Sequence, residues 1–442
     1  MTIYLGLGCN LGNRVAQLDQ AVDSLKRKGF RVSKVSPIVE SPAMLPKNAE
    51  PAWNRPYLNI VVAGDAAWTP RQGLEHAKAV ETALGREPGP RWSPRPMDID
   101  LLLWHDEQIM EPDLVIPHPG LAERDFVVTP LMHMGPDLTI PGRNQTVFEI
   151  SQDRLNIPLW MGILNITPDS FSDGDSWGDR EKLSNWVDRM IAENVQIIDI
   201  GAESTRPNAA GVSEDDEWRR LEPVLSMVRE RLADRHLRPM ISLDSRHPSI
   251  VEKALALGID MINDVTGLTD PNMVSLVRQS GLDVVAMHAM SVPVDPAMLL
   301  PGDSPAVPQL LEWLERRAGF WDSMGLNSGQ IIFDPGIGFG KTSIQAAEIM
   351  SGIADLRSAG LRVLVGHSRK SFMSAFCNRP AGQRDLETLG ISLALVAQGT
   401  DIIRVHQPMI HQRAYRAWSQ VALQDTCHWR GDPLTCLLYT SD

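Results

Sequence analysis

Two aspartates, Asp98 and Asp100, occupy alternate positions at the start of a predicted strand. Alternate side chains of a strand project from one face, so the two carboxylates point the same way, about 7 Å apart along the chain. Mg²⁺ is usually held by one or two carboxylates, with water and substrate phosphates in its other positions. An isolated pair of this kind is most often a solvated strand face, but its neighbours here favour a nucleotide triphosphate enzyme. These neighbours are Arg91, Trp92, Arg95, His118, Arg124 and Phe126.

A second group of polar residues lies at or just after the ends of apolar strands in the C-terminal half. Its members are Asn165, Asp199, Asp244, Asn263, Asp334, Arg404 and His406. Each one alone would more often be a helix N-cap or a loop residue. In a parallel barrel, however, the carboxyl ends of all the strands converge on one mouth, so this repeated placement predicts an enzyme active site.

Two glycine-containing segments near this group predict different things. Residues 366–371 (GHSRKS) join a strand to a predicted helix, so backbone N–H groups, hydroxyls and Lys370 are expected to surround a phosphate-like group. Residues 334–341 (DPGIGFGK) are only superficially similar to a P-loop. Gly336 stands five residues before Lys341, whereas that motif places its first glycine six before the lysine. Nucleotide binding is therefore not expected at this segment.

The first group of residues lies among alternating strand and helix patterns. Strands are predicted at 2–8, 31–39, 57–64 and 99–104, and helices from residue 15 up to Gly29 and at 70–84. The order β-α-β-β-α-β is typical of a ferredoxin-like α+β domain. Two proline-rich stretches between these elements, 41–56 and 86–96, are predicted to be active-site loops.

The second half repeats a buried strand, a loop and a helix, which predicts a (β/α)₈ barrel with its site at the carboxyl ends of the strands. The strands are predicted at 159–166, 196–200, 240–243, 261–263, 284–288, 331–333, 363–365 and 402–405. Helical patterns separate most of them, at 183–192, 217–232, 249–257, 308–324 and 386–397. We therefore expect an α+β ferredoxin-like domain over 1–150 and an α/β TIM barrel over 158–423. Residues 424–442 are expected to be a disordered or foreign tail.

Composition excludes several classes of partner. The net charge is −13 and both halves are acidic, so neither nucleic acid nor a membrane surface is expected as a partner. The four cysteines are too few for a disulfide framework and lack metal-finger spacing, which indicates a reducing compartment. No stretch approaches the roughly 18 apolar residues of a membrane span, and the first residues lack a signal-peptide pattern. A cytoplasmic enzyme is expected.

Three segments of the first half together carry a resemblance to a known family. They are residues 6–12 (GLGCNLG), 91–103 (RWSPRPMDIDLLL) and 116–119 (IPHP). In this order they resemble 6-hydroxymethyl-7,8-dihydropterin pyrophosphokinase over most of 1–150. The resemblance implies transfer of the β,γ-diphosphoryl unit of ATP to the pterin hydroxymethyl group, with release of AMP. Cys9 departs from the serine usual in this family, and we expect it to be a small packing residue rather than a redox group.

This resemblance implies roles for individual residues. Asp98 and Asp100 would hold two Mg²⁺ ions, with Arg95 as a catalytic cation beside them. The positions that match ATP contacts are Glu81, Arg91, His118 and Arg124. The positions that match the pterin side, where aromatic rings enclose a flat heterocycle and an amide reads its edge, are Tyr57, Asn59, Trp92 and Phe126.

The second half resembles dihydropteroate synthase. The segments that carry this resemblance are 161–174 (MGILNITPDSFSDG), 199–207 (DIGAESTRP), 263–265 (NDV), 334–341 and 368–371 (SRKS). Together they cover 158–423 in the order of the family. The implied reaction condenses 6-hydroxymethyl-7,8-dihydropterin diphosphate with 4-aminobenzoate to give 7,8-dihydropteroate and diphosphate.

The second resemblance also assigns residues. The pterin ring would be held by Asp244, Asn263, Asp334 and Lys370. The diphosphate would be bound by Asn165 with one Mg²⁺, by Arg404 and His406, and by Thr205 and Arg206 on nearby loops. The aminobenzoate would be framed by Pro207, Phe339 and Ser368. A homodimer through the barrel is an expectation that the sequence leaves open.

The two resemblances together predict a bifunctional enzyme of folate biosynthesis, because the product of the first site is the substrate of the second. Two alternatives remain open at this point. One is a barrel that transfers methyl groups from a bound pterin, and the other is a pterin-binding protein without catalytic activity. The matched diphosphate-site and metal-site residues disfavour both.

Overall fold

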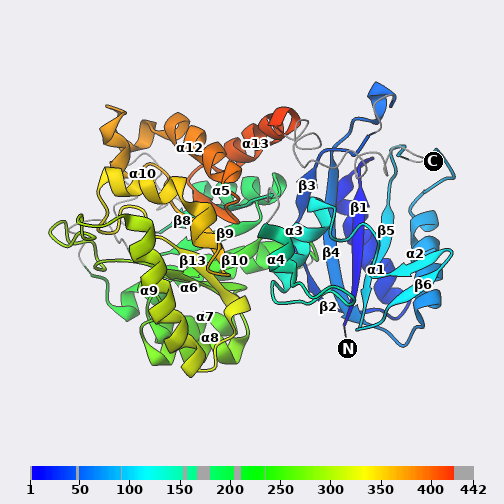
Figure 1. Ribbon diagram of the computed structural model, residues 1–442, viewed down its shortest axis with the longest axis horizontal. Coiled ribbons are helices and arrows are strands. Elements are labelled where there is room, and N and C mark those ends of the chain that lie inside the picture. The colour runs from blue at the N-terminus through cyan, green and yellow to red at the C-terminus, as the bar shows by residue number, and fades with distance from the viewer. Residues whose placement is uncertain are drawn as a thin grey trace. The chain divides into compact units, whose positions relative to one another are not determined.

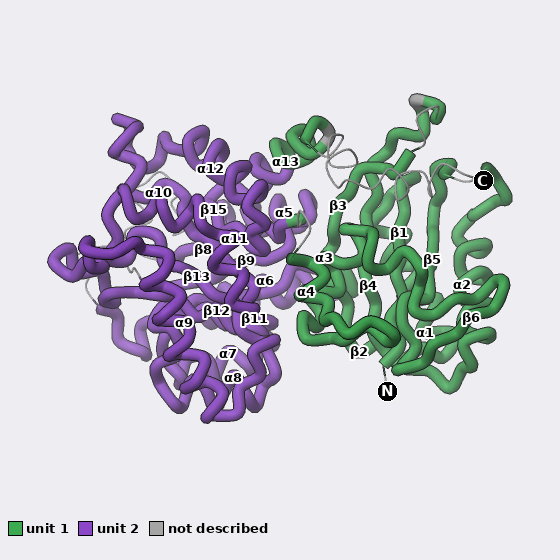
Figure 2. Tube along the Cα trace, viewed as in Figure 1, with its two compact units in different colours: residues 1–157, 235–237, 413–442 green, residues 158–234, 238–412 purple. Residues whose placement is uncertain are grey.

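A computed structural model shows two compact units, coloured separately in Figure 2. The first unit comprises Met1–Ile157, Arg235–Leu237 and Arg413–Asp442, and the second comprises Pro158–Asp234 and Arg238–Gln412. The residues that the structure describes are 2–45, 49–90, 92–152, 157–166, 180–203, 211–233 and 235–422. The predicted tail over 424–442 lies outside them.

The first unit is built on an antiparallel sheet (Figure 1). Its elements are β1 (Ile3–Cys9), α1 (Arg14–Arg27), β2 (Arg31–Val35), β3 (Val39–Ser41), β4 (Tyr57–Asp65), α2 (Pro70–Ala83) and β5 (Asp98–Trp104). The strand order is β2-β4-β1-β5, with β3 also paired to β4. This order and the alternation of strands with α1 and α2 confirm the predicted ferredoxin-like α+β fold.

Local sequence explains where these elements begin and break. The Thr69 and Gln72 side chains form a reciprocal capping box at the start of α2, and Pro70 occupies its first turn, where its missing N–H costs nothing. The prediction of one strand over 31–39 is wrong, because the segment divides into β2 and β3. Pro37 lies between them and has no N–H to donate to a strand ladder.

Side chains on opposite faces of the sheet pack into two separate cores. Ile60 and Val62 of β4 belong to the core that contains Val22 of α1 and Val80 of α2. Val61, which lies between them in sequence, belongs to the core that contains residues of α3 (Asp125–Met134) and α4 (Val147–Gln152). The sequence patterns did not predict α3, α4 or the hairpin of β6 (Ile109–Glu111) and β7 (Leu114–Ile116).

The second unit is a closed parallel barrel, which confirms the predicted TIM architecture. Its strands are β8 (Leu159–Asn165), β9 (Ile197–Gly201), β10 (Met240–Asp244), β11 (Met261–Asp264), β12 (Asp283–Met287), β13 (Ile331–Asp334), β14 (Arg362–Val365) and β15 (Ile402–Val405). All eight coincide with predicted strands to within two residues. Buried side chains from the strands, such as Met161, Val285 and Leu364, form one apolar cluster. The barrel is therefore a packed support for the polar residues at its strand ends.

Helices follow most of the strands. They are α5 (Arg180–Ala192), α6 (Glu214–Leu232), α7 (Pro248–Ala256), α8 (Pro271–Ser280), α9 (Ala306–Ser323), α10 (Ser343–Ser351), α11 (Ile353–Arg357), α12 (Asp385–Ala397) and α13 (Pro408–Ala422). The five predicted helices are confirmed, and α8, α10, α11 and α13 were not predicted. Among the described residues, no helix has the length and apolar character to cross a membrane.

One prediction about the barrel is corrected. The segment 366–371 was expected to lead into a helix whose N-terminus would attract an anion. Ser371–Ala375 instead forms a short 3-10 turn, and the next α-helix begins only at Asp385. Any anion site at this segment must therefore depend on side chains and individual backbone groups.

Candidate active sites

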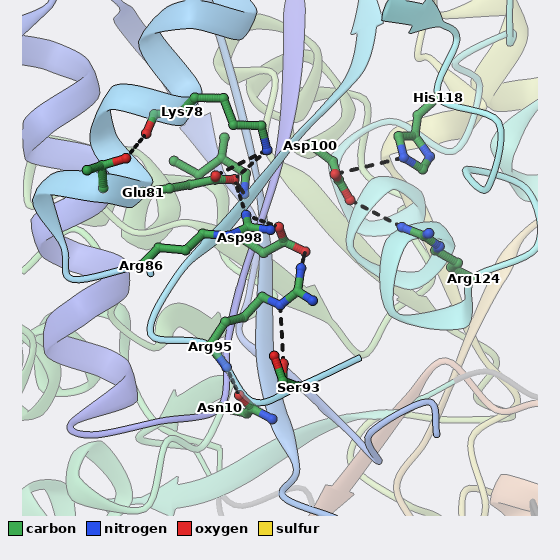
Figure 3. A network of polar contacts seen from close by, with 12 residues as sticks. Asn10, Lys78, Glu81, Arg86, Ser93, Arg95, Asp98, Asp100, His118 and Arg124 are labelled. Atoms are coloured by element: carbon green, nitrogen blue, oxygen red, sulfur yellow. Dashed lines mark hydrogen bonds and ion pairs between the residues drawn. The ribbon is translucent and has the colours of Figure 1, made fainter. Parts of the chain in front are cut away.

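The two carboxylates of β5 have separate cationic partners (Figure 3). Asp98 accepts hydrogen bonds from Arg86 Nη1 at 2.6 Å and from Arg95 Nη1 at 3.3 Å. Asp100 accepts one from Arg124 Nη1 at 3.2 Å. Burial alone would raise the pKa of Asp98, but the positive charges of Arg95 and Arg86 outweigh it, and the net pKa is lowered. Asp98 is therefore held in its charged form.

A buried glutamate, Glu81, holds part of β5 and one of the arginines in place. Glu81 is only 1% exposed, and its Oε1 accepts the Ile99 backbone N–H at 2.8 Å. The same oxygen lies 2.7 Å from Arg86 Nη1, so Glu81 fixes both the strand between the aspartates and the cation that reaches Asp98. The resemblance assigned Glu81 to ATP contacts, whereas the structure places it behind the carboxylates. Sequence reasoning missed Arg86, although this cation directly after Gly85, at the end of α2, was a signal that could have identified it.

His118 faces the second carboxylate. Its Nε2 lies 3.8 Å from Asp100 Oδ1, and its Nδ1 accepts the Gly120 backbone N–H at 3.0 Å. Because Nδ1 is an acceptor, the neutral ring carries its proton on Nε2, the nitrogen that faces the site. Burial lowers the pKa of His118, against the opposing effect of Asp100. A side chain at Gly120 would crowd Arg124, because a Cβ there would lie 2.7 Å from Arg124 Nε.

Tyr57 and Asn59 of β4, two of the residues assigned to the pterin, lie over β1. Gly8 pairs with Asn59 of β4 on one side and with Asp98 of β5 on the other, so amide and carboxylate stand at one level of the sheet. The Asn59 amide donates to Ser41 Oγ at 2.9 Å. A Cβ at Gly8 would lie 2.9 Å from Asn59 Oδ1 and 3.7 Å from the Tyr57 ring, so the absence of a side chain at this glycine lets these two side chains lie over the strand.

The structure describes most of the remaining predicted residues of this site, but not all of them. Phe126 lies at the start of α3 with the Arg124 guanidinium 5.9 Å from its ring centroid. Trp92 has a positive φ of 73° in the loop before β5. Arg91 lies outside the described residues. Cys9 is buried and donates to the Arg14 carbonyl, and burial raises the pKa of its thiol to about 12, which fits a packing role rather than redox chemistry.

In the barrel, one guanidinium lies between two carboxylates. Arg404 Nε donates to Asp199 Oδ2 at 2.6 Å, and its Nη2 donates to Asp244 Oδ2 at 2.9 Å. Asn263 Nδ2 donates to the same Asp199 oxygen at 3.2 Å. Burial, and then the like charge of Asp199, raise the pKa of Asp244 to about 7, while Arg404 opposes this rise. Strands β9, β10, β11 and β15 thus bring these four residues together. Asp199 was expected at the end of its strand and instead lies at the middle of β9.

Asp334 and Lys370 form a second pair of opposite charges next to this group. Burial raises the pKa of Asp334 and lowers that of Lys370 to about 8, and the attraction between the two groups opposes both shifts. Lys370 Nζ donates to the Ile337 carbonyl and lies 4.8 Å from the centroid of the Phe339 ring. Asp334 Oδ1 accepts the Gly336 N–H at 2.7 Å. A carboxylate, an ammonium and an aromatic face therefore border one side of the site.

The diphosphate-side residues are partly described. Ser368 Oγ lies 2.8 Å from His406 Nδ1 and accepts the His406 backbone N–H at 3.3 Å, so the two predicted residues are joined directly. Asn165 ends β8, paired with Gly201 of β9. Thr205 and Arg206, which were also assigned to this side, lie outside the described residues, and so does Pro207, which was assigned to the aminobenzoate.

Lys341 is a further buried lysine, and its amine contacts other groups of the protein. Its Nζ lies 2.7 Å from His288 Nδ1, 2.7 Å from the His288 carbonyl and 3.1 Å from the Phe339 carbonyl. Burial lowers the pKa of Lys341 to about 7. The lysine therefore ties the loop after β13 to the end of β12, which agrees with the expectation that 334–341 is not a P-loop.

Comparison with known proteins agrees with this geometry. Residues 4–136 match the family model of 7,8-dihydro-6-hydroxymethylpterin-pyrophosphokinase, and residues 161–406 match that of pterin binding enzymes. The "Folate synthesis bifunctional protein" of Chlamydia muridarum is 36% identical over 94% of this chain and 98% of its own length. The mitochondrial folate synthesis bifunctional protein of Arabidopsis thaliana is 32% identical over 91% of this chain and 80% of its own.

Solved structures resemble the barrel. Dihydropteroate synthase of Xanthomonas albilineans with 4-aminobenzoic acid has 31% identity and a TM-score of 0.54, covering 61% of this chain and 94% of that one. Dihydropteroate synthase of Burkholderia cenocepacia complexed with 7,8-dihydropteroate has 30% identity and a TM-score of 0.52, covering 62% and 94%.

A carboxylate pair ringed by cations and a barrel with acidic and basic strand ends define a chain with two pterin-processing transferase sites. The chain belongs to the family of bifunctional folate synthesis proteins. It catalyses the pyrophosphorylation of 6-hydroxymethyl-7,8-dihydropterin and the condensation of the product with 4-aminobenzoate. The full-length match favours condensation over both alternatives, methyl transfer and catalytically silent pterin binding.

Proposed function

We propose that the residues of the first unit divide into three sets around the transferred group. Asp98 and Asp100 hold two Mg²⁺ ions, and the aromatic and amide residues Tyr57, Asn59, Trp92 and Phe126 bind the pterin. The cations that bind the ATP phosphates are Arg86, Arg91, Arg95, His118 and Arg124. The described residues contain no cluster of three or more metal-ligating side chains. Two carboxylates are nevertheless the set that suits Mg²⁺ when phosphates and water complete its shell.

The first reaction then depends on positioning and charge neutralisation. The pterin hydroxymethyl oxygen attacks the β-phosphorus of ATP and its hydroxyl proton is lost to solvent. The bond between the β-phosphorus and the oxygen that bridges to the α-phosphate breaks, and AMP leaves with that oxygen. Bound Mg²⁺ would supply neutralisation of the phosphate oxygens. Arg95 and Arg86 supply further positive charge beside Asp98, and Nε2–H of His118 is directed toward the same phosphates. Glu81 keeps Arg86 and the strand in place from behind.

The roles in the barrel follow from the same kind of argument. Asp334 and Asn263 accept hydrogen bonds from the donor-rich edge of the pterin, and Asp244 and Lys370 complete the ring site. Arg404 and His406 bind the diphosphate, together with Thr205, Arg206 and a Mg²⁺ at Asn165. Ser368, Phe339 and Pro207 frame the aminobenzoate.

The second reaction is a displacement at the pterin methylene carbon. The bond between this carbon and the diphosphate oxygen breaks, and the amine of 4-aminobenzoate forms the new C–N bond and loses a proton to solvent. Arg404 and His406 stabilise the negative charge that develops on the leaving diphosphate. Bound Mg²⁺ would add charge stabilisation at the same oxygens.

The observation that carries the proposal is that carboxylates and cations are brought together at β5 in the first unit and at the strand ends of the barrel in the second. The test uses the full chain with ATP, Mg²⁺, the hydroxymethyl pterin and 4-aminobenzoate. We expect Asp98→Asn to lower AMP release about 1000-fold and to leave condensation unchanged when pterin diphosphate is supplied. Asp334→Asn is the matched variant, and it should lower only condensation.

The two variants separate the possible failures. If Asp98→Asn releases AMP at the wild-type rate, the metal assignment is wrong. If Asp334→Asn condenses normally, the pterin assignment in the barrel is wrong. Loss of both reactions in either variant would show a general folding defect, which circular dichroism would detect.

Location and assembly are separate proposals. Cys9 and Cys377 are free thiols, which supports a reducing compartment and hence the cytoplasm. Cell fractionation tests this location. The homodimer through the barrel stays a prediction, which light scattering of the purified chain would check.

A further inference from the structure

Asp199 is the most enclosed carboxylate of the barrel site. It lies at the middle of β9 and its side chain is 0% exposed. Three donors from three other strands reach it. Ser242 Oγ of β10 donates to Oδ1 at 2.6 Å, and Asn263 Nδ2 of β11 and Arg404 Nε of β15 both donate to Oδ2, at 3.2 and 2.6 Å. No ligand can replace these contacts without moving three strand side chains.

The Asp199 carboxylate determines which way the Asn263 amide faces. An ionised carboxylate only accepts hydrogen bonds, so the amide must turn its NH₂ toward Asp199. The Asn263 oxygen is then the end presented away from Asp199. The donor-rich edge of a pterin requires acceptors, so this orientation is the one that the ring needs.

The same oxygen of Asp199 fixes the Arg404 guanidinium. With Nε bound to Asp199 and Nη2 bound to Asp244, two hydrogen bonds from one planar group set its plane. Nη1 is the nitrogen that these two carboxylates leave for the diphosphate. A preset guanidinium stabilises developing charge without the cost of reorienting during the reaction.

We infer that Asp199 is a positioning residue that aligns the pterin-binding amide of Asn263 and the diphosphate-binding guanidinium of Arg404 through one oxygen atom. It touches neither substrate. This inference rests on the roles proposed above for Asn263 and Arg404. It adds that the two halves of the pterin diphosphate are recognised by side chains with a common anchor.

The test compares two buried aspartates of the barrel. Asp401 is also 0% exposed and paired to an arginine, Arg357, but it precedes β15 at the opposite end from the strand-end residues. With pterin diphosphate supplied, Asp199→Asn should raise its KM about 10- to 100-fold, because each hydrogen bond to a charged group is worth that order. The KM for 4-aminobenzoate should stay within about twofold. Asp401→Asn should lower the melting temperature and leave both KM values unchanged.

A merely structural role gives a different result. If Asp199→Asn lowers kcat and thermal stability but leaves the KM for pterin diphosphate unchanged, as in Asp401→Asn, the inference is overturned. Should the single variant not fold, the double variant Asp199→Asn with Arg404→Gln removes both buried charges together. It should bind 6-hydroxymethylpterin, which has no diphosphate, at least about tenfold more weakly than Arg404→Gln alone. Equal binding by the two would also overturn the inference.

Two further variants separate this inference from the proposed function. Asn263→Ala and Arg404→Gln should each raise the KM for pterin diphosphate. If neither does, the proposed roles of these residues fail. If both do and Asp199→Asn does not, only the positioning role of Asp199 fails.

Discussion

Asp98 in the first unit and Asp244 in the barrel are both paired to arginine, yet their pKa values move in opposite directions. Two arginines, Arg86 and Arg95, contact Asp98 and lower its pKa despite burial. Asp244 shares the single guanidinium of Arg404 with a second carboxylate, and burial and that like charge raise its pKa to about 7. The first site has more cations than carboxylates, whereas this part of the barrel site has more carboxylates than cations.

The difference in charge balance between the two sites matches the difference in charge between their ligands. A triphosphate brings several negative charges, so a site with surplus arginine is suited to receive it and its metal ions. A pterin ring brings hydrogen-bond donors and no formal charge, so a site rich in acceptors is suited to its edge. The means of support also differ. Loop arginines surround Asp98, while strand ends and buried lysine and histidine side chains support the barrel residues.

Among the substitutions that test this difference in support, Lys341→Met is expected to have the largest effect. This substitution removes the donor to His288 Nδ1 and to the His288 and Phe339 carbonyls. Buried acceptors left without a partner cost about 1–3 kcal/mol each, so we expect a loss of several kcal/mol in the free energy of unfolding. Condensation should fall at least about 100-fold, because Phe339 lies on the released loop and Asp334 ends the strand that leads into it. Denaturant unfolding and the two separate assays measure this.

The control for Lys341→Met is Lys253→Met. Lys253 is an exposed lysine on α7 that contacts the Trp218 ring, so its loss should change stability by less than about 1 kcal/mol. AMP release should be unaffected in both variants. Normal condensation by Lys341→Met would show that the barrel site does not depend on the buried contacts of Lys341.

The next effect concerns how barrel stability depends on pH. His367 is fully buried and bonded to the Thr388 carbonyl, and burial lowers its pKa to about 4. Its contribution to stability is therefore fully present above the unfolded pKa of about 6.5 and is lost as pH falls toward 4. Asp244 acts in the opposite direction, since its raised pKa stabilises the fold at low pH and this contribution is lost as pH rises through 7.

Two substitutions separate these contributions. Between pH 6.5 and 4, His367→Gln should flatten the acid-induced loss of stability by about 1.4 kcal/mol per pH unit, the value of one proton. Asp244→Asn should steepen it by the same order. Urea unfolding at a series of pH values gives the slopes. Parallel slopes for wild type and both variants would mean that neither group is perturbed by burial.

Sequence patterns predicted the barrel more completely than they predicted how its site is supported. Each strand, buried on both sides, reads as an apolar run, and a polar residue at its end marks the mouth. The patterns do not reveal that Asp199 is bonded to Asn263, because these residues are distant in sequence and meet only when β9, β10 and β11 assemble. The role of Lys341 was equally hidden. The glycine spacing spoke against a P-loop, but it did not predict that the lysine is buried against His288.

The first unit shows where sequence reasoning fails for loops. Asp98, Asp100, His118 and Arg124 were found because a strand and a family motif place them. Arg86 was missed because its contact with Asp98 depends on the path of the loop between α2 and β5, which no periodicity reports. The interruption at Pro37 was missed because the apolar pattern continues across it.

Gly8→Ala is expected to have the smallest effect. It tests whether Asn59, which is proposed to bind the pterin in the first unit, is held as firmly as the pterin-binding residues of the barrel. In Gly8→Ala the new methyl would lie 2.9 Å from Asn59 Oδ1, so the amide must shift by a few tenths of an ångström. We expect the KM for the hydroxymethyl pterin to rise about three- to tenfold, with the free energy of unfolding changed by less than about 1 kcal/mol. Gly6→Ala on the same strand serves as the control, because the atoms nearest to its new methyl belong to Leu102, at 3.2–3.3 Å, and not to Asn59. Equal KM values for the two variants would mean that Asn59 does not read the pterin, because only Gly8→Ala displaces its amide.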